Sequence, residues 1–352
     1  MQALLRELTD LLGPCGHEHD VARYIAQRVR PFADEVKVDG VGNVIAMVRG
    51  ASPGPTLVVS THMDEVGFIV KKIEENGLLR FDKLGGHDDR ILLAQRVRIG
   101  TDKGIVPGVI GTISAHMSKY DDPDKVRRHA KLYIDIGARD RKEVEELGVQ
   151  VGDPISWATD LERIGKTRVV GKAFDDRAGC AVLIQALSDI DFTKVSGTVY
   201  AVFSVQEEVG LRGARVAAHQ IEADVALAVD TTAVSDTVEE MMDDTLGLGR
   251  GPGIKVMDFS LIASVAVRKK LVALAKSNEI PYQLEVFSGI GTDAGELSAG
   301  HRGVPTGVLS IPSRYAHSPI EVIDLEDLQH TKELLVHFIE DLHPNSSFAF
   351  ID

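Results

Sequence analysis

The sequence predicts an α/β fold with a mixed central sheet covered by helices on both faces and an inserted small all-β domain. Near-continuous apolar stretches alternate with helical stretches, which is typical of strands buried between two layers of helices. Between residues 66 and 167 this rhythm gives way to short β-rich segments separated by glycine-containing turns. We therefore expect a discontinuous main domain, residues 1–65 and 168–352, and an insertion at residues 66–167.

Each element of this fold follows from a local pattern. Leucines near the N-terminus recur at helical spacing until Gly13-Pro14 ends the helix, and a second amphipathic helix follows. Helices are predicted at residues 1–12, 17–32, 140–147, 175–190, 212–219, 259–278 and 325–342. Strands are predicted at residues 35–39, 43–48, 56–61, 66–72, 96–100, 108–113, 131–136, 197–205, 225–230, 282–287 and 304–311.

Composition narrows the class of protein. With 352 residues, 44% of them hydrophobic and 26% charged, the chain can bury a large core and does not resemble a disordered or fibrous protein. The net charge of −14 argues against partners that are polyanions, so we expect neither nucleic-acid binding nor an anionic membrane surface. Two distant cysteines and an N-terminus without a signal-like apolar core favour a cytoplasmic protein.

The adjacent carboxylates Glu207 and Glu208 are the strongest single indication of chemistry. They directly follow the apolar run at residues 197–205. Because charged side chains are almost never buried without a partner, this strand end needs cations, a metal or open solvent. A solvated helix start remains an alternative explanation for the pair when it is considered alone.

Metal-capable side chains also follow other predicted strands. His62 and Asp64 stand two apart, so that Asp64 can reach the ring nitrogen of His62 that does not bind metal, although a surface turn would also explain them. Asp175-Asp176 precedes a helix, where one aspartate can serve as an N-cap. Asp230 and His317 follow two further strands, and each taken alone fits an ordinary turn or loop.

Together these residues predict a two-metal hydrolase site. Ligands bind at the carboxyl ends of strands in open α/β sheets, and a pair of metals needs one shared carboxylate and further N/O ligands. The predicted ligands, which supply that bridge and two more ligands per metal, are His62, Asp175, Glu208, Asp230 and His317. Donors of this kind without cysteine suit Zn²⁺, Co²⁺ or Mn²⁺. Glu207 is the predicted general base.

The motifs that carry these residues resemble those of the tetrahedral-type metalloaminopeptidases, which include glutamyl, leucyl and deblocking aminopeptidases. The matching segments are residues 62–67, 172–179, 206–210 and 314–318, supported by residues 92–97 and 291–294. The resemblance implies a zinc-peptidase-like main domain. It also implies one metal on His62, Asp175 and Asp230 and another on Asp175, Glu208 and His317, most often zinc.

Further expectations come from the same resemblance. Glu207 would be the base, Asp64 would orient His62, and the peptide bond after the bridging Asp175 would be cis. The substrates would be short peptides with a free N-terminus. The subunits would form a homo-oligomer, a tetrahedral dodecamer or, alternatively, a dimer, with the β-rich insertion building the contacts or acting as a lid.

Three other functions compete with the aminopeptidase. A metal-dependent deacylase could use the same scaffold with a different pocket. A glycoside hydrolase also needs paired carboxylates, but neighbouring residues on a strand diverge and the histidines would have no purpose. A non-catalytic binding protein would not require a base beside a complete ligand set.

Overall fold

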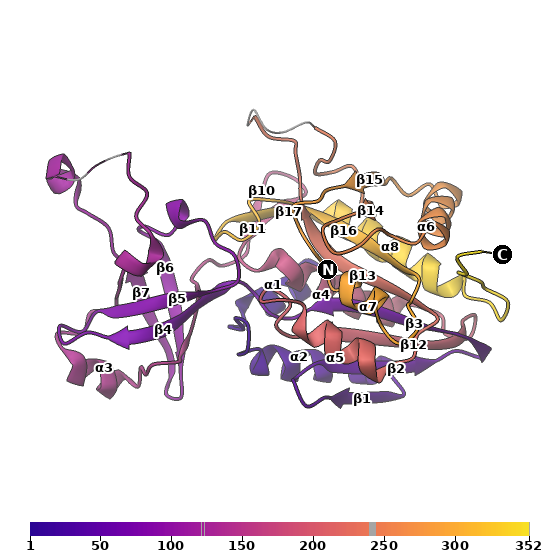
Figure 1. The fold of residues 1–352 in the computed structure, drawn as a ribbon, viewed down its shortest axis with the longest axis horizontal. Helices are drawn as coiled ribbons and strands as arrows, with labels where there is room; N and C mark the ends of the chain where they lie inside the picture. The colour runs from indigo at the N-terminus through magenta and orange to yellow at the C-terminus, as the bar shows by residue number, and fades with distance from the viewer. Residues whose placement is uncertain (121, 123, 239–243, 352) are drawn as a thin grey trace.

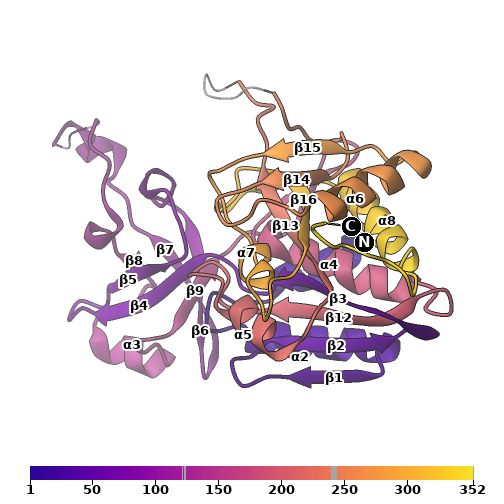
Figure 2. The same cartoon turned by 45° about the vertical axis from the view of Figure 1, so that its right-hand side comes forward.

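Two units make up the protein, a large α/β unit and a closed β-barrel (Figure 1). The structure is a computed structural model, and it describes residues 1–352 except 121, 123, 239–243 and 352. Figures 1 and 2 both show the barrel as a separate lobe beside the α/β unit. This arrangement agrees with the predicted fold class.

The large unit is built on an 11-stranded mixed sheet. The main path through this sheet is β1 (Glu35–Val38), β2 (Val44–Arg49), β12 (Ser196–Ser204), β3 (Ser52–His62), β13 (Val225–Ala233), β16 (Thr306–Arg314), β17 (Glu321–Asp324), β11 (Arg168–Gly171) and β10 (Glu162–Ile164). A side branch pairs β14 (Gly253–Met257) with β16 and with β15 (Gln283–Val286). The central strands β12, β3, β13 and β16 are parallel, so their carboxyl ends meet at one edge.

Helices cover both faces of this sheet because its buried strands alternate their side chains between two cores. In β3, Leu57 and Val59 join the larger core, whereas Val58 joins a smaller core on the other side. The larger core is packed by α1 (Gln2–Asp10), α2 (His19–Val29), α4 (Phe174–Asp189), α6 (Val265–Ser277) and α8 (Leu325–Glu340). The smaller core is packed by α5 (Arg212–Gln220) and α7 (Ala294–Ser298).

The second unit is a six-stranded barrel closed in the order β4 (Gly67–Ile73), β5 (Leu79–Leu84), β8 (Ile134–Asp135), β7 (Gly104–Ile110), β6 (Arg96–Thr101) and β9 (Pro154–Trp157). The short helix α3 (Arg141–Leu147) belongs to the same unit. Inward-facing apolar side chains fill the barrel, among them Phe68, Phe81 and Trp157, whose rings meet edge to face.

Two of the differences between the predictions and the structure have a clear physical reason or bear on the domain division. The strand β10 falls inside the predicted insertion but pairs with β11 in the large sheet. The helix predicted from residue 259 begins only at Val265. Here the Asp258 carboxylate accepts the amides of Ser260 and Leu261 at 2.7 Å each, which makes a turn and delays the helix.

A buried ionic cluster ties the barrel to the large unit. Glu65, on the segment that leads into the barrel, accepts Lys172 Nζ at 2.8 Å and Ser156 Oγ at 2.8 Å. The Arg177 guanidinium lies 3.8 Å from the same carboxylate and donates to backbone oxygens, including Met63 O at 2.5 Å. Glu65, Lys172 and Arg177 are each at most 1% exposed, so these charges depend on one another for solvation.

Among the helices that the structure describes, none has the length and apolar character needed to cross a bilayer.

Replacing Lys172 by Met should destabilise the protein markedly. The substitution leaves the buried Glu65 carboxylate without its closest cation, and breaking a buried ion pair typically costs about 3–5 kcal/mol. We expect a clearly lower urea midpoint, measured by circular dichroism. Lys142→Met is the matched control, because its ion pair with Glu146 is solvent-exposed and worth about 0.3–0.5 kcal/mol. Equal midpoints for the two variants would contradict the proposed importance of the cluster.

Candidate metal centre

The predicted ligands come together at the carboxyl edge of the parallel strands. His62 is the last residue of β3, and Asp230 lies in the neighbouring β13. Glu208 follows β12, His317 follows β16, and Asp175 stands in the first turn of α4. The four residues on or after strands reach the same edge because parallel strands place their chain ends side by side, and the first turn of α4 brings Asp175 to them.

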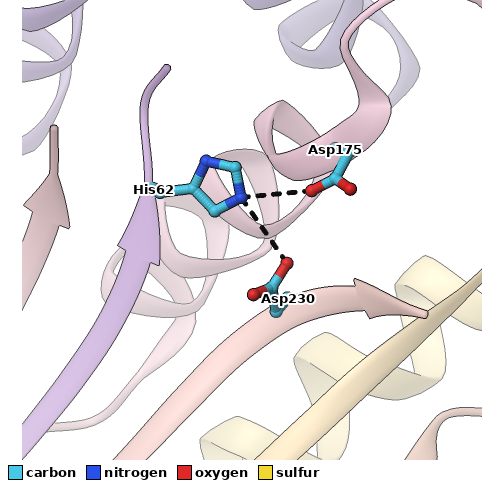
Figure 3. Close-up of side chains that lie close together, drawn as sticks. All are labelled: His62, Asp175 and Asp230. Atoms are coloured by element: carbon cyan, nitrogen blue, oxygen red, sulfur yellow. Dashed lines mark hydrogen bonds and ion pairs between the residues drawn. The ribbon is translucent and has the colours of Figure 1, made fainter. Parts of the chain in front are cut away.

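One group of potential ligands consists of His62, Asp175 and Asp230 (Figure 3). The Nε2 atom of His62 lies 3.1 Å from Asp175 Oδ1 and 3.6 Å from Asp230 Oδ1. Figure 3 shows this nitrogen pointing between the two carboxylates, which approach it from different elements.

The second group consists of Asp175, Glu208 and His317. The Nε2 atom of His317 lies 3.4 Å from Asp175 Oδ2 and 3.2 Å from Glu208 Oε1. Asp175 thus turns one oxygen to each histidine, which is the geometry of a bridging carboxylate. Within each group the donor atoms lie within 4.8 Å of one another.

The donor atoms of both groups fit divalent cations. The Nδ1 atom of His62 faces Asp64 O at 3.2 Å, and that of His317 faces Gly86 O at 2.9 Å. A neutral imidazole carries only one N–H, so hydrogen bonding at Nδ1 leaves the Nε2 lone pair for the carboxylate-lined side. The Glu208 Oε1 atom is buried and makes no hydrogen bond, although His317 Nε2 lies close to it. A cation between such atoms would satisfy both of them.

The protein alone leaves these groups electrostatically strained. Burial opposes the charge of both histidines, but nearby carboxylates raise the pKa of His62 and of His317 well above the ordinary value. Burial raises the pKa of Glu207 well above its usual range, and burial also raises that of Asp230 to about 7. The shifts of the two histidines reflect an excess of buried negative charge, which also adds to the shifts of the two carboxyl groups, and a pair of divalent cations would offset it.

Asp175 behaves differently from the other carboxylates. Burial alone would raise its pKa, but the hydrogen bonds from His317 and His62 hold the pKa well below the usual range. When their Nε2 atoms carry protons, the two histidines keep this shared carboxylate ionised, and cations at the two groups would take the place of those protons.

Other buried carboxylates hold the backbone of the site. The two oxygens of Asp64 accept the amides of Glu207 at 3.0 Å and Glu208 at 3.1 Å. This contact adds a role to the predicted one, because Asp64 also lies 3.4 Å from His62 Nδ1. Asp64 therefore positions both the turn that follows β12, called the β12 turn below, and the ring of His62.

Asp176 serves the backbone rather than the ligand groups. Its carboxylate accepts the amide of Gly179 at 3.0 Å, as a helix N-cap does, and that of His62 at 3.3 Å. The N-cap explanation therefore holds for this aspartate. The peptide bond between Asp175 and Asp176 is cis, as the resemblance implies.

Two contributors to the site were not predicted from the sequence. Glu321 is 1% exposed and accepts the amide of Asp175 at 3.1 Å and that of His317 at 2.9 Å. The only signal in the sequence was a charged residue inside the apolar stretch Ile320–Val322. Gly86, on a barrel loop, supplies the carbonyl oxygen that forms a hydrogen bond with His317 Nδ1. A backbone contact of this kind cannot be recognised from the sequence.

His87, for which the sequence predicts no role, packs the same barrel loop. Its ring stacks on Phe68 with centroids 4.5 Å apart, and Lys83 Nζ donates to its carbonyl at 2.8 Å. Burial lowers the pKa of His87 to about 3, so the ring is neutral in this apolar setting. The loop that carries Gly86 is thereby attached to the barrel core.

The two ligand groups open into a cavity of about 500 Å³. Glu207 lies in its wall together with the ligands, and Thr232, Phe259 and Ile290 are further lining residues. The ion pair between Arg215 and Glu296, 2.7 Å apart, is a further part of the wall. A cavity of this size falls within the usual range of small-ligand sites.

Comparison with known proteins identifies relatives of the whole chain. The family model described as M42 glutamyl aminopeptidase matches residues 42–334. A lysyl aminopeptidase of Pyrococcus furiosus is 34% identical over 345 residues, covering 97% of each chain. An aminopeptidase from the archaeon Desulfurococcus kamchatkensis has a similar structure, with a TM-score of 0.92, 40% identity, and 97% of this chain and 95% of that chain covered.

The TET1 peptidase of Pyrococcus horikoshii is also similar, with a TM-score of 0.88, 34% identity, and 97% of this chain and 99% of that chain covered. That peptidase can assemble into a tetrahedron or a large octahedral shell.

Removing ligands should change the metal content in steps. Asp175→Ala disturbs both ligand groups and should abolish metal loading, whereas His317→Ala leaves the first group intact and should spare one ion. The measurement is the number of metal ions per subunit by mass spectrometry after loading and gel filtration. Asp189→Ala, at the other end of α4, is the control. Unchanged metal content in Asp175→Ala would show that the shared carboxylate is not a ligand.

Proposed function

Because the chain belongs to the M42 glutamyl aminopeptidase family and is a metal-dependent aminopeptidase, we propose that it releases single residues from peptide N-termini at the centre around Asp175. The observation that carries this proposal is the convergence of two ligand groups on one shared carboxylate, with Glu207 beside them. Such a pair of groups has the composition of a two-metal hydrolytic site.

The residues would divide the metals between them as the ligand groups suggest. His62 and Asp230 would hold one ion, Glu208 and His317 the other, and Asp175 would bridge them. When bound, the two ions would lower the pKa of a water molecule and polarise the scissile carbonyl. Nitrogen and oxygen donors without cysteine suit zinc, cobalt or manganese, and we propose zinc as the resident metal.

Glu207 would act as the general base. It lies in the cavity wall, and in the part of the chain that the structure describes no side chain hydrogen-bonds its carboxylate. Burial, together with the charges of Asp230 and Glu208, favours proton uptake by this group, while His62 opposes it. The carboxylate would take a proton from the attacking water and then deliver it to the departing amine.

The excess of carboxylates lining the cavity would explain why the peptide substrate needs a free N-terminus. A peptide α-ammonium or amine is attracted by the buried negative charge around Glu207, Glu208 and Asp230. The cavity would then receive the first side chain, with Phe259 and Ile290 offering apolar contacts. An acylated N-terminus lacks the basic nitrogen and would lose this anchor.

The barrel would contribute to assembly and to closure of the site. We propose the division predicted from the sequence, with a peptidase domain at residues 1–65 and 168–352 and an oligomerisation or lid domain at 66–167, except that β10 (Glu162–Ile164) belongs to the peptidase sheet. The contact between Gly86 and His317 supports a role beside the active site. A homo-oligomer of the tetrahedral dodecamer type, or otherwise a dimer, is the proposed assembly, and a monomer in sedimentation velocity would exclude both.

The proposed location is the cytoplasm. Both cysteines are free and buried, so the described fold does not depend on a disulfide. A secreted native protein, detected by cell fractionation, would contradict this proposal.

Free and N-acetylated versions of one short peptide test the proposed reaction. We expect cleavage of the free peptide, loss of this activity with a chelator and recovery when metal is restored, because hydrolysis needs both the ions and the amine anchor. A preference for removing the acetyl group would favour the deacylase. Cleavage of a β-glucan oligosaccharide that survives chelation would favour the glycoside hydrolase.

Replacing Glu207 by Gln should separate catalysis from metal binding. The variant keeps the side-chain shape and all ligands, so metal content should stay at the wild-type level while turnover falls by about 10²–10⁴-fold. Steady-state kinetics with metal analysis on the same sample provides the measurement. Glu222→Gln, on the exposed surface, is the control and should not change either quantity. Near-normal turnover in Glu207→Gln would remove the base from the proposal.

A further inference from the structure

The turn that carries the proposed base has three successive backbone amides, and each of them donates to a buried carboxylate. The amides of Glu207 and Glu208 go to the two oxygens of Asp64. The amide of Gln206 goes to Glu18 Oε1 at 3.0 Å, across a separation of 188 residues in the chain. We propose that Glu18 is a positioning residue for catalysis. By holding the amide of Gln206 at the start of this turn, it orients the side chain of Glu207.

The turn needs such an external anchor because its own conformation is unfavourable. Gln206 has a φ of +54°, in the left-handed region that side chains with a Cβ atom seldom occupy. Residues in that region persist only where the surrounding structure fixes them. Asp64 fixes the two residues after Gln206, and Glu18 fixes Gln206 itself, so the conformation is held at every amide.

Glu18 does not act as a side-chain cap for the helix that follows it. It precedes α2, but its side chain makes no capping hydrogen bond to that helix. The same Oε1 atom that receives Gln206 also accepts the amide of Gly16 at 2.8 Å, so the segment between α1 and α2 is tied to the β12 turn. The carboxylate therefore links two segments rather than stabilising one.

The placement of Glu18 is also unfavourable by itself. The residue is 4% exposed, and within the described residues no Lys, Arg or His forms an ion pair with it. Burial raises its pKa to about 7, with a further contribution from Asp64. A buried acid without a cation is retained where its hydrogen bonds are needed, and here they reach the residue next to Glu207.

The inference rests on the proposed role of Glu207 as the base, and it predicts how two substitutions differ. Glu18→Ala removes the oxygen that accepts the amides of Gly16 and Gln206, so the Glu207 carboxylate is no longer held in its position. A small misplacement of a reacting group of this kind should lower kcat by about 10²-fold. KM and metal content should stay within about twofold, since the ligands remain. Glu18→Gln keeps the carbonyl Oε1 that accepts both amides, so kcat should stay within about threefold of wild type.

Hydrogen–deuterium exchange of the metal-loaded protein gives a readout that does not depend on activity. The peptide spanning residues 204–210 should exchange at least about tenfold faster in Glu18→Ala and at the wild-type rate in Glu18→Gln, since exchange follows local opening. Asp20→Ala, an exposed carboxylate in the first turn of α2, is the matched control and should change neither kcat nor exchange.

The outcomes separate this proposal from the proposed function. Wild-type kcat and wild-type exchange in Glu18→Ala would overturn the positioning role. Equal losses in Glu18→Ala and Glu18→Gln would overturn it too, because the negative charge rather than the acceptor would then matter. Faster exchange in Glu18→Ala with unchanged kcat would show that the turn is held by Glu18 but does not set catalysis, which also contradicts the proposal. Failure of Glu207 as the base would appear separately, as full turnover in Glu207→Gln.

Discussion

The candidate site depends on one kind of interaction, the hydrogen bond from a backbone amide to a buried carboxylate. Asp64 holds the amides of Glu207 and Glu208, and Glu321 holds those of Asp175 and His317. Asp176 receives the amide of His62. Hydrogen bonds to an ionised carboxylate are stronger than those between neutral groups in a low-dielectric interior. Side chains that come from separate elements can therefore meet with little freedom at a single edge of the sheet.

The same arrangement creates an electrostatic problem that the site itself would resolve. Carboxylates that orient the backbone lie just behind carboxylates that face the cavity, and burial raises the pKa of many of them. His62 and His317 offset part of this charge, and both ring nitrogens of each histidine face acceptors. Divalent cations at the two ligand groups would neutralise the excess. Metal binding and the order of the site are thus expected to support each other.

The barrel is connected to this centre at two points. The buried cluster of Glu65, Lys172 and Arg177 joins the start of the barrel to the segment that leads into Asp175. The Gly86 carbonyl oxygen forms a hydrogen bond with His317 Nδ1. Movement of the barrel would therefore first displace His317 in the second ligand group. Among the described residues, the first group (His62, Asp175 and Asp230) makes no hydrogen bond to the barrel.

The sequence by itself determined the layers of the fold and the residues that face the cavity. Apolar periodicity marks β3, β12, β13 and β16, and polar side chains directly after such strands must gather at the carboxyl edge of a parallel sheet. His62, Glu208, Asp230 and His317 could be named for that reason, and Asp175 as one of two adjacent carboxylates before a helix. Only the tertiary structure showed which other residues hold these ligands and the proposed base in position. Glu18, Glu321 and Gly86 act on backbone amides or imidazoles from distant segments, and such contacts have no period, spacing or composition that a chain reveals before it folds.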